Sequence, residues 1–269
     1  MRMYIKVVFS LLIHYKSLYN EYSMNQTKSI VKKLSIPEKW VLLLVFFTCG
    51  FSQWAEYDVE DSFTSKDLRI FIESTTLGLS PNPSLISFSK NRVYVGVGLL
   101  KNTLLNSSIY QNQLSGLVPK FSADFFITNN LYFIGRLSQF YSDENIVHSH
   151  NYGIALISGE DVAYPWQSSV VFCNLMGPQD FALRFVSLTM VTLIQVADHQ
   201  IQVGLGKEMY SARFFLDEAK TLFPNGMKGE INYILLGVHF ERNSIGIIPQ
   251  IRFHPGLIGT SVRMTWGIG

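Results

Sequence analysis

The histidines are the residues best suited to chemistry in this sequence, and their spacing does not suit catalysis or metal binding. His148 and His150 are two residues apart, as in some metal sites, but the nearest carboxylates lie in an expected loop before them. Asp198-His199 is typical of a hairpin tip, and no Gly-x-Ser-x-Gly nucleophile motif occurs. We therefore predict no enzyme activity, no metal site and no cofactor.

Two glycine pairs match half of a dinucleotide-binding fingerprint. They are Gly-Val-Gly at 96–98 and Gly-Leu-Gly at 204–206, and neither precedes a helical pattern. We interpret them as strand glycines that leave room for packing in a barrel interior. Cys173 lies in the apolar run Val-Val-Phe-Cys, which favours a small strand residue over a nucleophile.

Charged residues within the expected strands are the main candidate site. A Lys or Arg that faces hydrocarbon at the middle of a membrane costs roughly 2–4 kcal/mol, so such residues should point into a lumen. The predicted lumen-facing residues are Arg136, Arg184, Arg252, Arg263, Glu230 and Glu241, with Asp124 as a further partner. Paired charges and small residues would fill a small barrel, so no open channel of porin size is expected.

The composition limits the class of protein. Charged residues make up 16% of the 269 residues, against about 25% in soluble domains, whereas 48% are hydrophobic. With 22 basic and 20 acidic residues, the chain has neither the balance of a nucleic-acid-binding protein nor that of a disordered one. Two cysteines are too few for a disulfide scaffold.

The N-terminal part, 1–53, is predicted to be an export signal. It has seven basic and two acidic residues, and it contains an apolar run of about 12 residues from Trp40 to Phe51. A membrane-spanning helix needs about 20 such residues, whereas a signal peptide needs about this number. Translation could start at Met24, which opens an ordinary charged n-region. Two alternatives stay open: lipidation at Cys49, and a separate role for the apolar segment 4–13.

After the signal, 54–91 is expected to form a solvated acidic leader and an Asn-Pro turn, and 92–269 a β-barrel. The expected strands are 92–100, 119–128, 131–141, 150–158, 167–175, 180–196, 200–210, 229–242, 244–253 and 258–268. In the last of them, apolar residues from Ile258 to Ile268 alternate with small or polar residues from Gly259 to Gly267. This alternation with a period of two gives one apolar and one polar face.

Details of these segments lead to further expectations. Pro249 should cause a bulge, and 180–196 is long enough to project beyond the membrane or to contain a turn near 188–191. The long connections 101–118, 142–149 and 211–228 all follow odd strands, so they would gather at one end of an up-and-down barrel. The segment 212–223 has helical spacing and precedes the breaker Pro224-Asn225-Gly226, which predicts a short amphipathic helix there.

The segment Ser80-Pro81-Asn82-Pro83-Ser84-Leu85 resembles the Asn-Pro-Ala-Leu-Leu-type turn of the PorV/PorQ outer-membrane proteins, relatives of the fatty-acid transporter barrels. Asn82, Pro83, Ser84 and Leu85 would form the turn. The resemblance covers roughly 67–97 and implies that a short N-terminal segment packs near the lumen. The chain departs from that family in lacking the acidic pair before the motif and in ending on Trp-Gly-Ile-Gly.

These observations together predict an all-β fold, an antiparallel up-and-down transmembrane β-barrel of about ten strands. We expect it in the outer membrane of a Gram-negative bacterium, in contact with outer-membrane lipids and other envelope proteins and not with nucleic acid. A structural, transport or secretion-associated role without catalysis follows. The alternative is a soluble exported or lipid-anchored β-sandwich that binds a partner, whose outward strand faces would be charged.

Overall fold

A computed structural model describes residues 64–83, 92–104, 117–142, 145–158, 165–177, 181–196, 199–215, 225–242 and 245–268. The predicted export signal at 1–53, with its start at Met24 and with Cys49, lies outside the described residues. So do Ser84 and Leu85 of the Asn-Pro turn.

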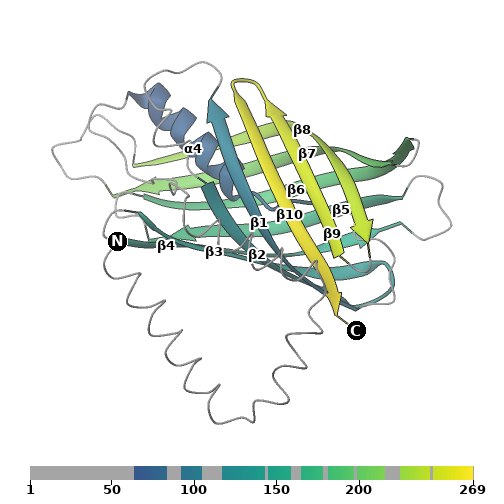
Figure 1. Cartoon of the computed structure of the whole chain (residues 1–269). Helices are drawn as coiled ribbons and strands as arrows, with labels where there is room; N and C mark the ends of the chain where they lie inside the picture. The colour runs from purple at the N-terminus through teal and green to yellow at the C-terminus, as the bar shows by residue number, and fades with distance from the viewer. Residues whose placement is uncertain are drawn as a thin grey trace, which may run out of the picture. The chain divides into compact units, whose positions relative to one another are not determined.

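Ten antiparallel strands form a closed barrel in which each strand pairs with its neighbours along the chain, and β1 pairs with β10 to close the ring (Figure 1). The strands are β1 (Val93–Leu104), β2 (Leu117–Phe126), β3 (Leu131–Ser142), β4 (Asn145–Ile157), β5 (Trp166–Met176), β6 (Phe181–Val196), β7 (His199–Phe214), β8 (Gly226–Arg242), β9 (Ile245–His254) and β10 (Leu257–Ile268). The ten predicted strands and the barrel are thus confirmed. The closed ring excludes the β-sandwich alternative.

Of the two alternatives for 180–196, the structure excludes the turn: strand β6 runs unbroken from Phe181 to Val196, because it pairs with β7 over its whole length. Two other local expectations were wrong. Pro249 causes no bulge: the register of β9 with β8 and with β10 is the same on both sides of it. The segment 212–223 does not begin as a helix, since β7 continues through Phe214; residues 216–224 lie outside the described residues.

The connections divide the barrel into two ends. The odd end carries the connections 105–116, 143–144, 177–180, 215–225 and 255–256, and the even end carries 127–130, 158–165, 197–198 and 243–244. The expected long connection at 142–149 was wrong, because β3 and β4 are joined by 143–144 alone. Two of the three longest connections, 105–116 and 215–225, are at the odd end, and 158–165 is at the even end.

One helix, α4 (Ser65–Leu79), precedes the barrel strands in the described part of the chain, and the sequence analysis did not predict it. Thr64 and Asp67 form a capping box in which the Asp67 carboxylate accepts a hydrogen bond from the Thr64 amide at 2.9 Å. The helix ends before Pro81, since the residue preceding a proline avoids helical angles. Of the described residues, none belongs to a helix that is both long and apolar enough to cross a membrane.

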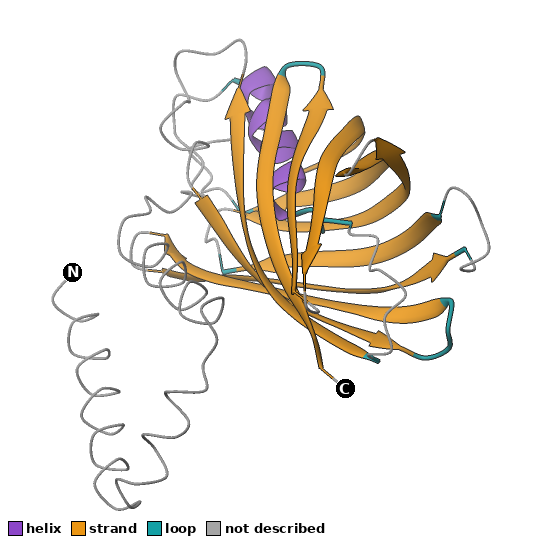
Figure 2. Ribbon diagram, turned by 45° about the vertical axis from the view of Figure 1, so that its right-hand side comes forward, coloured by secondary structure: helices purple, strands orange, loops and turns teal. Residues whose placement is uncertain are grey.

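Figure 2 shows α4 enclosed by the ring of strands. It contacts β1, β7, β8 and β10 from within. Leu68, Phe71 and Ile72 on its apolar side are almost completely buried, and the Phe71 ring packs edge-on against Phe181 of β6 with 5.5 Å between ring centres. The expected solvated leader therefore becomes, from Thr64 onward, a helix inside the barrel.

Candidate functional site

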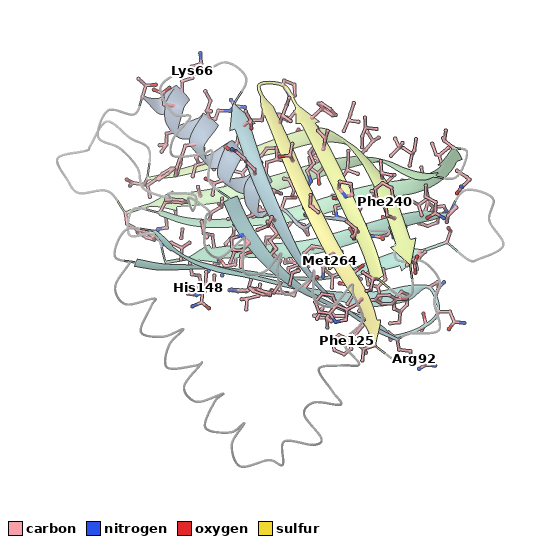
Figure 3. The ribbon with its side chains drawn as sticks, viewed as in Figure 1. Lys66, Arg92, Phe125, His148, Phe240 and Met264 are labelled. Atoms are coloured by element: carbon pink, nitrogen blue, oxygen red, sulfur yellow. The ribbon has the colours of Figure 1, made fainter. Side chains whose placement is uncertain are left out.

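The two faces of the barrel wall differ in polarity. Strand β5, for example, alternates between buried and exposed residues along its length. The outward face exposes large apolar side chains such as Phe125, Leu205 and Phe172, which are 50%, 66% and 48% exposed. Phe125 is labelled in Figure 3. The interior holds most of the buried charged groups, among them Lys120, Asp124, Arg136, Glu208, Arg252 and Arg263.

Residues 64–83, here called the lumen segment, run through this interior from the odd end towards the even end. At the odd end, Phe71 of α4 contacts Phe181 and the Tyr210 hydroxyl donates to Glu73 at 3.4 Å. Further along, the Pro83 carbonyl accepts a hydrogen bond from Gln202, near the even end of β7. Figure 3 shows the same direction, with Lys66 of α4 and Arg92, just before β1, at opposite ends of the barrel.

The C-terminal end of α4 faces two cations. Arg252 donates to the carbonyl of Pro81 at 2.7 Å, to the side-chain oxygen of Asn82 at 2.5 Å, and to the Leu77 and Ser80 carbonyls at 3.4 Å. Lys120 donates to the Ser80 carbonyl at 2.5 Å. The last carbonyls of a helix have no partner within the helix and form its negative pole, so these cations satisfy the backbone and stabilise the dipole.

Side-chain amides bind the other carbonyls of the same segment. Asn102 donates to Ser74 at 2.6 Å and Asn151 to Leu79 at 3.1 Å. Gln250 and Gln202 both donate to the Pro83 carbonyl, at 2.5 and 3.2 Å. Buried carbonyls must find donors, and in this barrel the wall supplies them to a segment that has no strand partner.

Asp124 is the centre of a buried charge cluster. Arg136 binds it through both terminal guanidinium nitrogens, and Arg263 binds it at 2.6 Å. Arg263 also donates to the Asn82 carbonyl at 3.3 Å, which connects the cluster to the lumen segment. Two cations share one carboxylate here, so the cluster has an excess positive charge that the Asn82 carbonyl helps to stabilise.

Glu208 on β7 fixes the segment from the opposite wall. Its carboxylate accepts hydrogen bonds from the hydroxyls of Ser80, Ser187 at 3.0 Å and Tyr233 at 3.1 Å. Ser80 therefore contributes both its hydroxyl and its carbonyl to the wall, the first to Glu208 and the second to Lys120. The interior is occupied at this level by the protein's own chain.

The structure places the predicted lumen residues in different environments. Arg136, Arg252 and Arg263 point inward and are buried, and Asp124 is the partner of two of them. Arg184 and Glu230 lie on the outward face instead, and Glu241 is exposed near the even end of β8. Glu230 pairs there with Lys207 at 2.7 Å.

Sequence reasoning missed Lys120 and Glu208 as interior residues, whereas Gln202 and Gln250 lie on the polar strand faces that the sequence assigns to the lumen and are buried there. The pattern of β7 contained the signal for Glu208, because it has the same parity as Gln202, Gly204 and Gly206, which the sequence assigns to the lumen. Of the Asn-Pro turn, Asn82 and Pro83 lie in the lumen, in agreement with what the resemblance implied about an N-terminal segment.

The described histidines do not meet in one place. His148 and His150 have the outward parity of β4, whereas His239 is mostly buried and contacts the Gln200 side-chain oxygen at 3.1 Å. Among the described residues, no group of three or more His, Cys, Asp or Glu side chains could hold a metal ion. Cys173 is buried in β5, as its apolar surroundings predicted.

A closed barrel with an apolar outer face and a polar interior leaves no backbone group unpaired towards lipid, which is the requirement for strands that span a membrane. Together these features define an integral outer-membrane β-barrel.

No protein-family model matches the sequence, and no curated protein matches it. Solved structures match in fold at low similarity. The translocator domain of the autotransporter NalP from Neisseria meningitidis is 8% identical, with a TM-score of 0.40 over 76% of this chain and 95% of that one. The KdgM porin in complex with disordered oligogalacturonate is 7% identical, with a TM-score of 0.37 over 65% and 99%. The transport unit of the autotransporter AIDA-I from Escherichia coli is 8% identical, with a TM-score of 0.33 over 74% and 97%.

Proposed function

We propose that this protein is a secretion-associated outer-membrane barrel that holds its own N-terminal segment across the membrane and presents the chain before Thr64 at the cell surface. The observation that carries this proposal is the course of the chain, which begins α4 at the odd end, crosses the lumen and starts β1 at the even end. Strand β10 also ends at the even end, so the chain enters the barrel domain at the odd end and leaves it at the even end.

The orientation follows from the connections. Bacterial barrels have longer loops outside the cell and short turns on the periplasmic side. The two longest connections, 105–116 and 215–225, are at the odd end, so we assign that end to the cell exterior. Thr64 then joins the preceding chain on the outside, where other envelope proteins could reach it.

The proposal also explains why the lumen is filled. A barrel of about this strand number has an interior just wide enough for side chains, and here α4 and residues 80–83 occupy part of it. The hydrogen bonds from Arg252, Lys120 and Gln250 fix the segment in place. A passage for solutes is therefore not the function that we propose.

Two tagged versions of the full chain test the proposal. One carries an epitope tag between Asp61 and Ser62, and the other carries the same tag after Gly269. An antibody added to intact cells should label the first version and not the second, and permeabilised cells should show both. If the tag before α4 is labelled only after permeabilisation, or if the C-terminal tag is labelled on intact cells, the proposed orientation is wrong.

The proposal includes no catalytic step. A variant with His148, His150, His199 and His239 all replaced by Gln should assemble in the outer membrane and present the N-terminal tag as the unchanged protein does. A hydrolase activity of the purified protein that disappears in this variant would contradict the proposal.

A further inference from the structure

The outward face of the wall has one continuous polar row, close to the odd end. In the register of β4 to β8, five outward residues are direct cross-strand neighbours: His150, Asn174, Arg184, Ser211 and Lys228. The His150 ring and the Asn174 amide are in contact at 3.4 Å. Adjacent strands are about 4.8 Å apart, so the row is a band roughly 20 Å long.

The row is basic. Arg184 and Lys228 are both exposed, and Arg213, two residues beyond Ser211, is exposed as well and lies over the Phe215 ring. No member of the row is acidic, and among the described residues neither Arg184 nor Lys228 has a carboxylate within ion-pair distance. The nearest exposed carboxylate on β8, Glu230, is paired with Lys207.

The row borders a groove in the outer wall. The groove has a volume of about 660 Å³ and contains all five residues of the row. Tyr152, Phe172, Val186 and Met209 also line it, on the side away from the odd end. The groove therefore has a cationic edge and an apolar floor.

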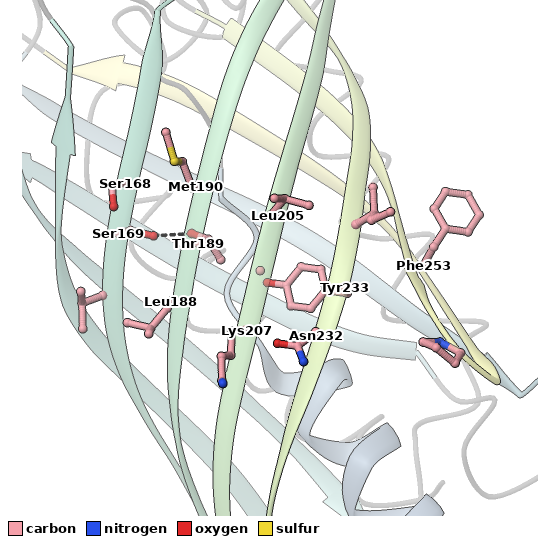
Figure 4. A pocket seen from close by; sticks show the side chains of 14 residues that line it. Ser168, Ser169, Leu188, Thr189, Met190, Leu205, Lys207, Asn232, Tyr233 and Phe253 are labelled. Atoms are coloured by element: carbon pink, nitrogen blue, oxygen red, sulfur yellow. Dashed lines mark hydrogen bonds between the residues drawn. The ribbon is translucent and has the colours of Figure 1, made fainter.

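A second groove continues from the first along the same strands. It has a volume of about 640 Å³. Its outward lining is mainly apolar, with Leu188, Met190, Leu205 and Phe253, and Lys207 and Asn232 line its side nearest the basic row (Figure 4). On β6 it begins at Leu188, four residues beyond Arg184, and on β7 at Lys207, four residues before Ser211. At about 3.3 Å per residue, this is a distance of roughly 13 Å from the basic row into the membrane.

A cation on the outside of a barrel is unfavourable in hydrocarbon and favourable among anionic headgroups near the membrane surface. Arg184 is the fourth residue of β6 and Lys228 the third of β8, counted from the odd end, which places both at the edge of the wall. The positive charge of Arg184 and Lys228 and their position near the membrane surface thus both point to an anionic lipid headgroup as the partner.

We propose that the basic row binds the phosphate group of an anionic membrane amphiphile, whose acyl chain lies in the adjoining apolar groove. Arg184 and Lys228 bind the phosphate, and Asn174 and Ser211 donate further hydrogen bonds. The site belongs to the outer surface of the barrel and does not depend on the lumen segment or on the presentation of the N-terminal chain. The proposal requires only that this wall contacts lipid.

Lipid retention by the purified full chain, measured by native mass spectrometry in a nonionic detergent, tests this site. Dioleoyl phosphatidic acid is the anionic probe and dioleoyl phosphatidylcholine the zwitterionic one. The protein should retain phosphatidic acid preferentially. The double variant Arg184→Gln with Lys228→Gln should weaken its binding roughly thirtyfold, if each cation contributes what basic residues usually do at an anionic lipid surface.

The matched control is the double variant Arg92→Gln with Lys101→Gln, which removes two exposed cations from the β1 side of the barrel and none from the row. It should retain phosphatidic acid as the unchanged protein does. Equal losses in the two double variants, or equal retention of the two lipids, would overturn the proposal. Displacement of phosphatidic acid by an equal concentration of inorganic phosphate would also overturn it, because the apolar groove would then contribute nothing. Heat-dependent gel migration verifies that each variant is folded.

Discussion

Arg263 and Arg184 are both strand arginines, yet the barrel places them in opposite environments. Arg263 is 3% exposed, points inward and binds Asp124 and the Asn82 carbonyl. Arg184 is exposed on the outer wall, beside Asn174 and Ser211 of the neighbouring strands. The difference shows that position along a strand, and not residue type alone, decides which face a charge takes.

The two arginines differ because the wall encloses an apolar helix near the odd end and polar backbone groups deeper in the barrel. Near the odd end, the inward face of β6 is apolar because Phe181 and Leu183 enclose α4, so there is no polar partner for an arginine. Deeper in the barrel, the lumen segment has left its helix and exposes carbonyls, so the wall supplies cations. On the outer wall, Arg184 lies close to the odd end, whereas Lys207, in the middle of β7, is paired with Glu230.

The largest expected effect comes from Asp124, the carboxylate that two interior arginines share. Asp124→Asn should lower the free energy of unfolding by about 3–5 kcal/mol, because a buried charge cluster is then left with two cations and no anion. Urea unfolding of the protein folded in lipid vesicles measures this change. The exposed carboxylate variant Glu230→Gln is the control and should change stability by less than about 1 kcal/mol. A similar result for both variants would refute the idea that the interior cluster is desolvated.

Arg263→Leu should cost somewhat less, about 3 kcal/mol, since Asp124 keeps Arg136 while the Asn82 carbonyl loses a donor. Met264→Leu is its neighbour on the opposite face and should cost less than about 1.5 kcal/mol, as volume-conserving apolar changes do. The same vesicle unfolding assay compares them. If Met264→Leu were the more damaging change, the assignment of the two faces of β10 would have to be reversed.

Gly206 gives a smaller effect that depends on shape alone. A β-carbon at this position would come within 2.1 Å of the Tyr233 ring, its direct partner on β8. Gly206→Ala should therefore destabilise the barrel by about 1–3 kcal/mol, because Tyr233 must move and would lose its hydrogen bond to Glu208. Gly135→Ala, where the nearest atom is 3.4 Å away, is the control and should be close to neutral. Equal costs at the two glycines would show that Tyr233 can move aside freely.

Arg184→Gln should have the smallest effect on the free energy of unfolding, below about 1 kcal/mol, because the exposed Arg184 side chain makes few buried contacts that the substitution could remove. Its effect should appear instead in the retention of anionic lipid. A loss of stability as large as that of Arg263→Leu would mean that Arg184 has a buried partner, and the contrast between the two faces would no longer hold.

The sequence by itself determined the barrel. Strands rich in β-branched and aromatic residues, separated by turns, gave all ten strands, and the alternation in 258–268 gave the inward face of Arg263. These features are local: a period of two and a turn signal are visible without knowledge of any neighbouring strand. The polar partner Asp124 could also be named, because it stands in an expected strand close to Arg136 in the sequence.

Only the tertiary structure decided the position of α4 and the face of Arg184. The helix was missed because its capping residues were interpreted as part of an acidic leader, and because its apolar side is matched by residues such as Phe181 that lie far away in the chain. Strand β6 has large apolar residues on both faces, and only Ser187 and Thr189 mark its inward face, so the alternation gives a weak signal for the direction of Arg184. Which face is interior there depends on what the barrel encloses, and that is a property of the closed ring and its contents, not of any single strand.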